Sequence, residues 1–321
     1  MDIYIAFSNL NHRFQQLVKS GSRIQYEINR HFLTTKETFF NQPKEFKQQI
    51  YSFYFQLLEH SINEFLPLFI IDCYSYINLQ SIIIEDIEKD QLISLLNHLS
   101  HLPCLYSLNI KTTDSIEDLT HIYQLIFSLS QLKSNRLLLY GDQCSISLPV
   151  ATNNQLSSLE YLDIAHWYTF DELSALLSYT PRLRCLNLSN SNWYDFNLED
   201  MSPINLNHLI RLSMYTQYLN FDQFQLFIEK IHSKLKVLHV NFAKRDINFL
   251  DADRWQQFLS QNFAQLEKFS LHYREPGLGD DYSIYNGESN QFISPFWMEK
   301  NVIFDIEIHE YNIQYFLRPY K

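Results

Sequence analysis

Residues 183–188 read Leu183-Arg184-Cys185-Leu186-Asn187-Leu188, with leucine at the first, fourth and sixth positions. The same spacing of apolar residues returns at 209–214 (LIRLSM) and at 235–240 (LKVLHV). In each copy the last two apolar residues alternate with a polar or small one, as a short strand with one buried face requires. The pattern therefore predicts a short strand that recurs along the chain.

Outward from this point, the motif extends over most of the sequence. Successive first positions lie 24 to 31 residues apart, so the copies have a nearly constant period. The other apolar triplets are Leu79, Ile82, Ile84; Leu105, Leu108, Ile110; Leu159, Leu162, Ile164; and Leu266, Phe269, Leu271, with a degenerate copy at Leu132, Leu137, Leu139.

Helices are predicted between the strands, because apolar residues there recur at spacings of three and four. Two such runs are Leu92, Leu95, Leu96, Leu99 and Leu119, Ile122, Leu125, Ile126. Thr169 with Glu172, and Asn220 with Gln223, have the spacing of a capping box, and Asp251 is placed to begin a further helix. One strand and one helix cannot bury an apolar face alone, so stacked units must share a core.

The triplets and their period resemble the leucine-rich-repeat family over about residues 78–273. The resemblance implies an α/β solenoid with a curved parallel sheet inside and helices outside. The chain departs from the common repeat in lacking a regular asparagine eight residues after the first leucine. Thr113, Trp167, Ser191, Gln217 and Ala243 stand there instead.

The first 20 residues form an amphipathic stretch in which residues 6–14 (AFSNLNHRF) resemble the closing half of an F-box. F-boxes precede leucine-rich repeats in substrate receptors of ubiquitin ligases, and the resemblance implies that Phe7, Leu10 and Phe14 face the adaptor. The leading Leu-Pro-x-Glu half has no counterpart, so we expect these 321 residues to bind the adaptor weakly or not at all.

The remaining segments are expected to cover the ends of the core. Residues 21–77 are aromatic-rich and predict a helical N-terminal cap, and residues 274–321 predict a C-terminal cap. The residues expected to close the C-terminal end are Phe296, Trp297, Ile303, Phe304 and Ile306.

Composition excludes several classes of protein. The net charge of −11 is the wrong sign for nucleic-acid binding and for attraction to anionic membranes. No apolar run approaches the roughly 20 residues of a membrane span, and no secretory signal begins the chain, so we expect a cytoplasmic or nuclear protein. Four widely spaced cysteines fit reduced thiols better than disulfides or a zinc site.

No catalytic motif is present: the sequence contains no G-x-S-x-G elbow, Walker A loop or H-E-x-x-H helix. His98 and His101 lack further ligands at metal-binding spacing, and the acidic turn around Gly277 and Gly279 does not follow an EF-hand. We expect no enzyme, no cofactor and no metal. An active site assembled from scattered residues remains the alternative class.

The expected function is protein recognition by a monomer, resembling the substrate-binding part of an F-box/leucine-rich-repeat receptor. A free-standing binding scaffold is the alternative. Leu108, Leu162, Leu186, Leu212 and Leu238 should form a buried ladder, so their strand neighbours should point to the exposed, concave face. The predicted partner-binding set is Asn109, Tyr161, Asp163, Asn187, Arg211, Tyr215, His239, Lys268 and His272.

Overall fold

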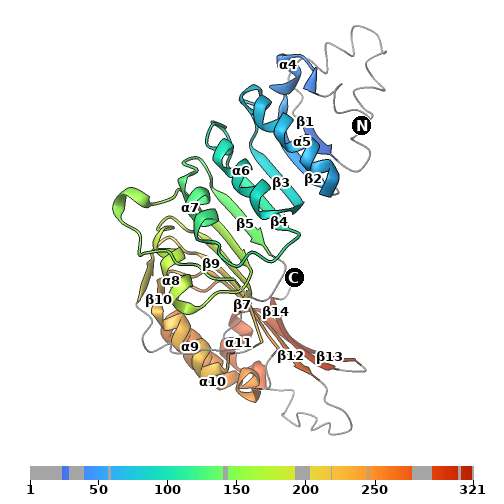
Figure 1. The fold of residues 1–321 in the computed structure, drawn as a ribbon. Coiled ribbons are helices and arrows are strands. Elements are labelled where there is room, and N and C mark those ends of the chain that lie inside the picture. The colour runs from blue at the N-terminus through green and yellow to red at the C-terminus, as the bar shows by residue number, and fades with distance from the viewer. Residues whose placement is uncertain are drawn as a thin grey trace. The chain divides into compact units, whose positions relative to one another are not determined.

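The computed structural model describes residues 24–28, 40–56, 59–139, 144–191, 203–217, 219–243, 246–276, 291–309 and 312–319 (Figure 1). Its fold is α/β with a mostly parallel sheet. The chain divides into an N-terminal unit (Met1–Ser147 with Ser157–Leu159) and a C-terminal unit (Leu148–Leu156 with Glu160–Lys321). The F-box-like residues Phe7, Leu10 and Phe14 and the glycines of the acidic turn lie outside the described residues.

In the N-terminal unit, parallel strands follow one another in sequence order. These strands are β1 (Ile24–Ile28), β2 (Ile50–Gln56), β3 (Ser81–Ile87), β4 (Ser107–Thr112) and β5 (Ser134–Leu138). The helices of this unit are α4 (Lys44–Lys47), α5 (Glu59–Asp72), α6 (Lys89–Leu99) and α7 (Thr120–Ser128), with a short 3-10 turn η2 (Cys73–Ser75).

The C-terminal unit continues the same alternation and ends differently. Its sheet has the order β6-β7-β9-β11-β12-β14-β13, in which the last two strands pair antiparallel. These strands are β6 (Tyr161–Ala165), β7 (Cys185–Ser191), β9 (Arg211–Thr216), β11 (Val237–Phe242), β12 (Lys268–Pro276), β14 (Asn312–Pro319) and β13 (Val302–His309). A separate parallel pair consists of β8 (Ile204–Leu206) and β10 (Ile231–Ser233).

Helices of the C-terminal unit pack on the sheet face that carries the buried leucines. For example, the ring of Phe224 on α9 meets Phe242 on β11 edge to face, with centroids 5.2 Å apart. Trp255 on α10 lies 4.9 Å from Phe269 on β12. The helices are α8 (Phe170–Ser178), α9 (Phe221–Lys230), α10 (Ala252–Asn262) and α11 (Pro295–Glu299), with 3-10 turns η3 (Asn153–Gln155), η4 (Ile247–Leu250) and η5 (Gln291–Ile293).

The predicted ladder of leucines is confirmed. Within the C-terminal unit, Leu162, Leu186, Leu212 and Leu238 are paired across neighbouring strands, and each is at most 1% exposed. Leu108 holds the equivalent place on β4 and is equally buried. Burial of one such side chain contributes about 1.5–3 kcal/mol, so the ladder is a principal source of stability.

The degenerate repeat was misassigned in one respect. Asn135, and not a leucine, pairs with Leu108, and Leu137 pairs with Ile110. The motif is therefore Leu132, Asn135, Leu137, with the ordinary spacing. Asn135 is fully buried, and its Nδ2 donates to the Leu108 carbonyl oxygen at 3.3 Å, which compensates part of the cost of burying an amide.

The prediction of a helical cap over residues 21–77 was wrong in part, because β1 and β2 extend the sheet. Ile50, Phe53 and Phe55 have the spacing of the apolar triplet and are 0%, 0% and 3% exposed. In register, Phe53 pairs with Ile82 and Phe55 with Ile84. Phenylalanine stands in two leucine positions, so the copy was not recognised as a repeat.

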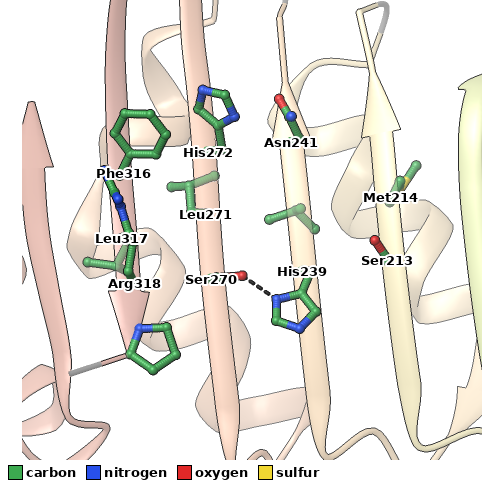
Figure 2. Close-up of a pocket in the computed structure, with 12 residues that line it drawn as sticks. Ser213, Met214, His239, Asn241, Ser270, Leu271, His272, Phe316, Leu317 and Arg318 are labelled. Atoms are coloured by element: carbon green, nitrogen blue, oxygen red, sulfur yellow. Dashed lines mark hydrogen bonds between the residues drawn. The ribbon is translucent and has the colours of Figure 1, made fainter. Parts of the chain in front are cut away.

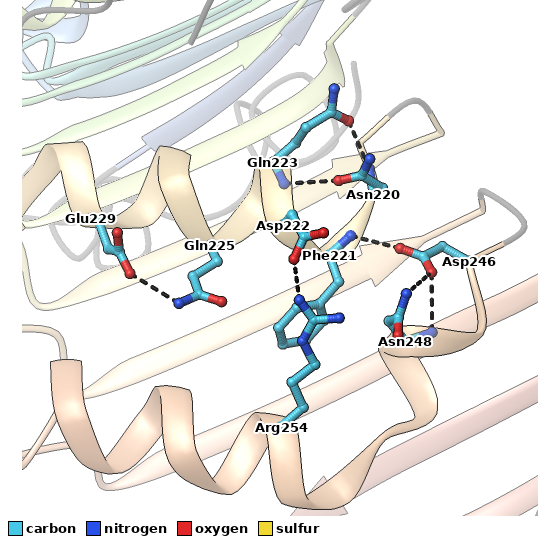
Figure 3. Close-up of polar contacts among 9 residues, drawn as sticks. All are labelled: Asn220, Phe221, Asp222, Gln223, Gln225, Glu229, Asp246, Asn248 and Arg254. Atoms are coloured by element: carbon cyan, nitrogen blue, oxygen red, sulfur yellow. Dashed lines mark hydrogen bonds and ion pairs between the residues drawn. The ribbon is translucent and has the colours of Figure 1, made fainter. Parts of the chain in front are cut away.

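The predicted helix starts are confirmed, and Figure 3 shows one of them in detail. Asn220 Oδ1 accepts from the Gln223 amide at 2.8 Å, while Gln223 Oε1 accepts from the Asn220 amide at 3.0 Å. Asp246 belongs to the next repeat along the chain, and its Oδ2 accepts from the Phe221 amide at 2.7 Å. Amides at the helix start lack partners within the helix, so these contacts fix where α9 begins.

The predicted closure of the core by the C-terminal segment is confirmed for Trp297, whereas Phe296 and Phe304 are half-buried and Ile303 and Ile306 are exposed. Trp297 on α11 is 1% exposed and packs on Phe292 and Phe269 at centroid distances of 5.0 and 5.9 Å. Ile303 and Ile306 are 46% and 39% exposed. They lie on β13, the last strand in the order, where less of the unit surrounds them.

Candidate functional site

One surface of the C-terminal unit gathers most of the predicted binding residues. Strand alternation turns them away from the helices, and the register places them in rows across β6, β7, β9, β11 and β12. We call this surface the open face, and it comprises Tyr161, Cys185, Asn187, Arg211, Ser213, Tyr215, Val237, His239, Asn241, Lys268, Ser270 and His272. All of them are exposed or half-buried.

Two predicted residues do not belong to the open face. Asn109 pairs with Ile83 and Arg136 in the N-terminal unit. Asp163 was expected to be exposed and is only 3% exposed. The physical reason is that β6 is buried on both faces from Leu162 to Ala165, so alternation along this strand does not imply exposure.

The open face contains an open hollow of about 380 Å³ (Figure 2). Polar and apolar residues of β9, β11 and β12 line it together with four residues of β14: Ser213, Met214, His239, Val240, Asn241, Ser270, Leu271, His272, Phe316, Leu317, Arg318 and Pro319. His239 Nδ1 is hydrogen-bonded to Ser270 Oγ. His272 stacks on Phe316 with ring centroids 4.4 Å apart, and its Nε2 lies 2.9 Å from Gln314 Oε1.

Both histidines of the hollow favour the neutral form. Burial lowers the pKa of His239, and the charges of Arg211 and Lys268 lower it further. Burial is also the main cause of the lowered pKa of His272. The free nitrogen of His239 can donate or accept, because the Ser270 hydroxyl can take either role towards Nδ1. His272 donates from Nε2 to Gln314 Oε1, so its neutral ring leaves Nδ1 as an acceptor.

Aromatic and cationic groups lie together at one wall of the hollow. The guanidinium carbon of Arg318 lies 4.1 Å from the centre of the Phe316 ring. Arg318 Nη2 also contacts Glu307 Oε1 at 2.8 Å, which holds the guanidinium in place. Such arginine and aromatic side chains are enriched among the residues that dominate protein–protein binding energies.

The His239–Ser270 pair has two members of a nucleophilic triad, but within the described ranges no carboxylate contacts His239 to orient its ring. Nor do the described residues include a group of three side chains that could hold a metal.

Sequence reasoning did not identify the β14 residues of the hollow. Phe316 pairs with His272 only because β14 lies antiparallel beside β12, and no repeat pattern places it there. Sequence reasoning also missed His166. This histidine is fully buried, and its burial lowers its pKa to about 4. A usable signal exists, because His166 follows Leu159 by seven residues, as the buried Thr112 and Thr216 follow Leu105 and Leu209.

Comparison with family models and with curated protein sequences found no match. Among the described helices, none combines the length and apolar character needed to cross a bilayer.

Proposed function

We propose that the chain is a leucine-rich-repeat protein whose open face binds another protein without catalysis. Strands that recur every 24 to 31 residues, with buried apolar triplets in register, support the repeat assignment. The observation that carries the binding function is the open face itself. It presents tyrosine, arginine and histidine side chains around a hollow, while the opposite face of the same sheet is buried in the core.

The residues of the open face do little for the core, which is why their presence favours a ligand. Tyr161 is 37% exposed, and Arg211 and Lys268 are also exposed. Tyrosine and arginine side chains gathered on one exposed surface are typical of a protein-binding site. Desolvation of such groups by a protein partner would convert them into the main source of affinity.

Binding through the open face predicts a large loss of affinity when Tyr161, Arg211 and Tyr215 are replaced by alanine together. The partner is first identified by photo-crosslinking from Asn187, with a crosslinker at Gln257 on α10 as the control position. Affinity should then fall by at least about tenfold in the triple variant, because anchor residues contribute more than about 1 kcal/mol each.

The matched control replaces three exposed polar residues of α10, Gln257, Ser260 and Gln261, by alanine. This variant should bind the partner as the wild type does. Loss of binding in the control, together with unchanged binding in the open-face variant, would show that the helix side is the interface and that the proposal is wrong.

The resemblance of residues 6–14 to an F-box supports a role as the substrate-binding part of a ubiquitin ligase receptor. A free-standing scaffold is the alternative. A pull-down of the adaptor with the native protein separates them, because a receptor must bind the adaptor and a scaffold need not. Calorimetry with the purified adaptor measures what residues 1–321 bind alone. We expect weak or no binding, and a submicromolar dissociation constant would contradict that expectation.

A further inference from the structure

A second hollow, of about 490 Å³, lies in the C-terminal unit where the chain enters successive strands. It shares no lining residue with the hollow of the open face. Its lining residues are Glu160, Arg182, Arg184, Asn207, His208, Ile210, Lys234, Lys236 and Gln265. Four permanent cations therefore face one carboxylate in a chain whose net charge is −11.

The cations form a ladder because the repeat places them at equivalent positions. Arg184 and Lys236 each precede a strand directly, as Ile210 does between them. Arg182, His208 and Lys234 lie two residues earlier in the same three repeats, on the other side of a buried leucine. Since neighbouring strands are about 4.8 Å apart, the arginine pair and the lysine pair are separated by about 9.6 Å.

Backbone groups of this ladder are already paired. The amides of Ile210 and Arg211 donate to the Arg184 carbonyl oxygen at 2.9 and 3.0 Å, and those of Lys236 and Val237 donate to the Ile210 carbonyl oxygen at the same distances. A ligand in the hollow would therefore meet the charged side chains and the half-buried Ile210, and not free backbone groups.

The cations are available to a ligand. All four are exposed, and within the described part of the chain the side chains of Arg182, Arg184 and Lys234 have no hydrogen bond or ion pair. Lys236 contacts Glu267 at 2.6 Å, an exposed pair that contributes little to stability. Arg182, Arg184 and Lys234 are like charges gathered without such a partner, and they repel one another, so the fold gains little from placing them together.

We propose that this basic ladder binds an acidic segment of a protein partner in an extended, polyproline-II-like conformation. In that conformation side chains three residues apart lie on one side of the segment, about 9.3 Å from each other. A carboxylate at position i would thus reach the arginine pair, and one at position i+3 would reach the lysine pair. The apolar part of the segment between the two carboxylates would lie over Ile210. A single phosphate is too small to bridge both pairs, and a long nucleic acid is repelled by the net charge of −11.

The test is fluorescence anisotropy with a labelled peptide of Glu-Pro-Pro repeats, whose prolines enforce the spacing. We expect binding that weakens with added salt and that is absent for a Gln-Pro-Pro peptide. Reversal of one cation from each pair, Arg184→Glu with Lys234→Glu, should weaken binding by about tenfold or more. The neutral variant Arg184→Gln with Lys234→Gln should also weaken peptide binding. It keeps the proposal testable if the charge-reversed variant does not fold.

The control with the same change of charge is Lys44→Glu with Lys89→Glu, two exposed cations of the N-terminal unit. It should bind within about twofold of the wild type, since neither residue lines the hollow. Three results would overturn the proposal: no binding by the wild type, equal binding by the reversed variant, or equal binding of a peptide with its glutamates adjacent. Tighter binding of inorganic phosphate or of a single-stranded oligonucleotide, lost on the same reversal, would show that the ligand class is wrong.

Discussion

Replacing Leu186 by aspartate is expected to lower the free energy of unfolding by about 4 kcal/mol, because an unpaired carboxylate would occupy a dry apolar site. Leu186 is 1% exposed and lies in register between Leu162 and Leu212, which are fully buried. No cation is within the ladder to compensate the charge. The measurement is equilibrium denaturation followed by circular dichroism.

A control residue is adjacent to the target. Asn187 follows Leu186 on β7 and is half-buried on the open face, so Asn187→Asp introduces the same charge on the same strand where solvent still reaches it. Asn187 pairs with Asp163 on β6, so this change should cost about 1 kcal/mol, much less than Leu186→Asp. If Leu186→Asp does not fold, Leu186→Ala should still fold and cost about 2–5 kcal/mol. A thermal melt of Leu186→Asp that matches the wild type would show that the ladder is not a core.

Acidification should destabilise the protein in part through His166. This ring is 1% exposed, and burial lowers its pKa from 6.5 to about 4. Its Nδ1 lies 2.7 Å from the Trp167 carbonyl oxygen, so the neutral form carries its proton there. Between pH 6.5 and about pH 4, His166 is protonated in the unfolded state and neutral in the folded state. The stability due to neutral His166 is therefore complete above pH 6.5 and is lost as the pH falls towards 4.

The expected size of this effect is about 2 kcal/mol between pH 7 and pH 5. It is measured as the difference in pH dependence between the wild type and His166→Gln in denaturant unfolding. The variant itself starts from a lower stability, so only its slope with pH is compared. The control is Thr112→Ser, which changes a buried side chain without removing a titratable group and should keep the slope of the wild type. Equal slopes for the wild type and His166→Gln would contradict the assignment.

The repeat and its buried ladder could be predicted from the sequence because they depend on local periodicity. Each triplet specifies one short strand with one apolar face, and the constant spacing brings equivalent leucines side by side. The helix starts at Thr169, Asn220 and Asp251 follow from capping chemistry within four residues. Where a different side chain occupied a leucine position, as at Phe53 and Asn135, the same periodicity was present but was not recognised.

Three features required the tertiary structure. Asp163 is buried although its strand alternates, because exposure depends on what lies over a face and not on the direction of a side chain. Phe316 reaches His272 because β14 pairs with β12 out of sequence order. The basic ladder joins residues more than 50 positions apart, from Arg182 to Lys234, whose charges are unremarkable singly. Periodicity determines which residues occupy equivalent positions in the repeats. Which side chains are buried, and which lie together, is determined only when the repeats stack on one another.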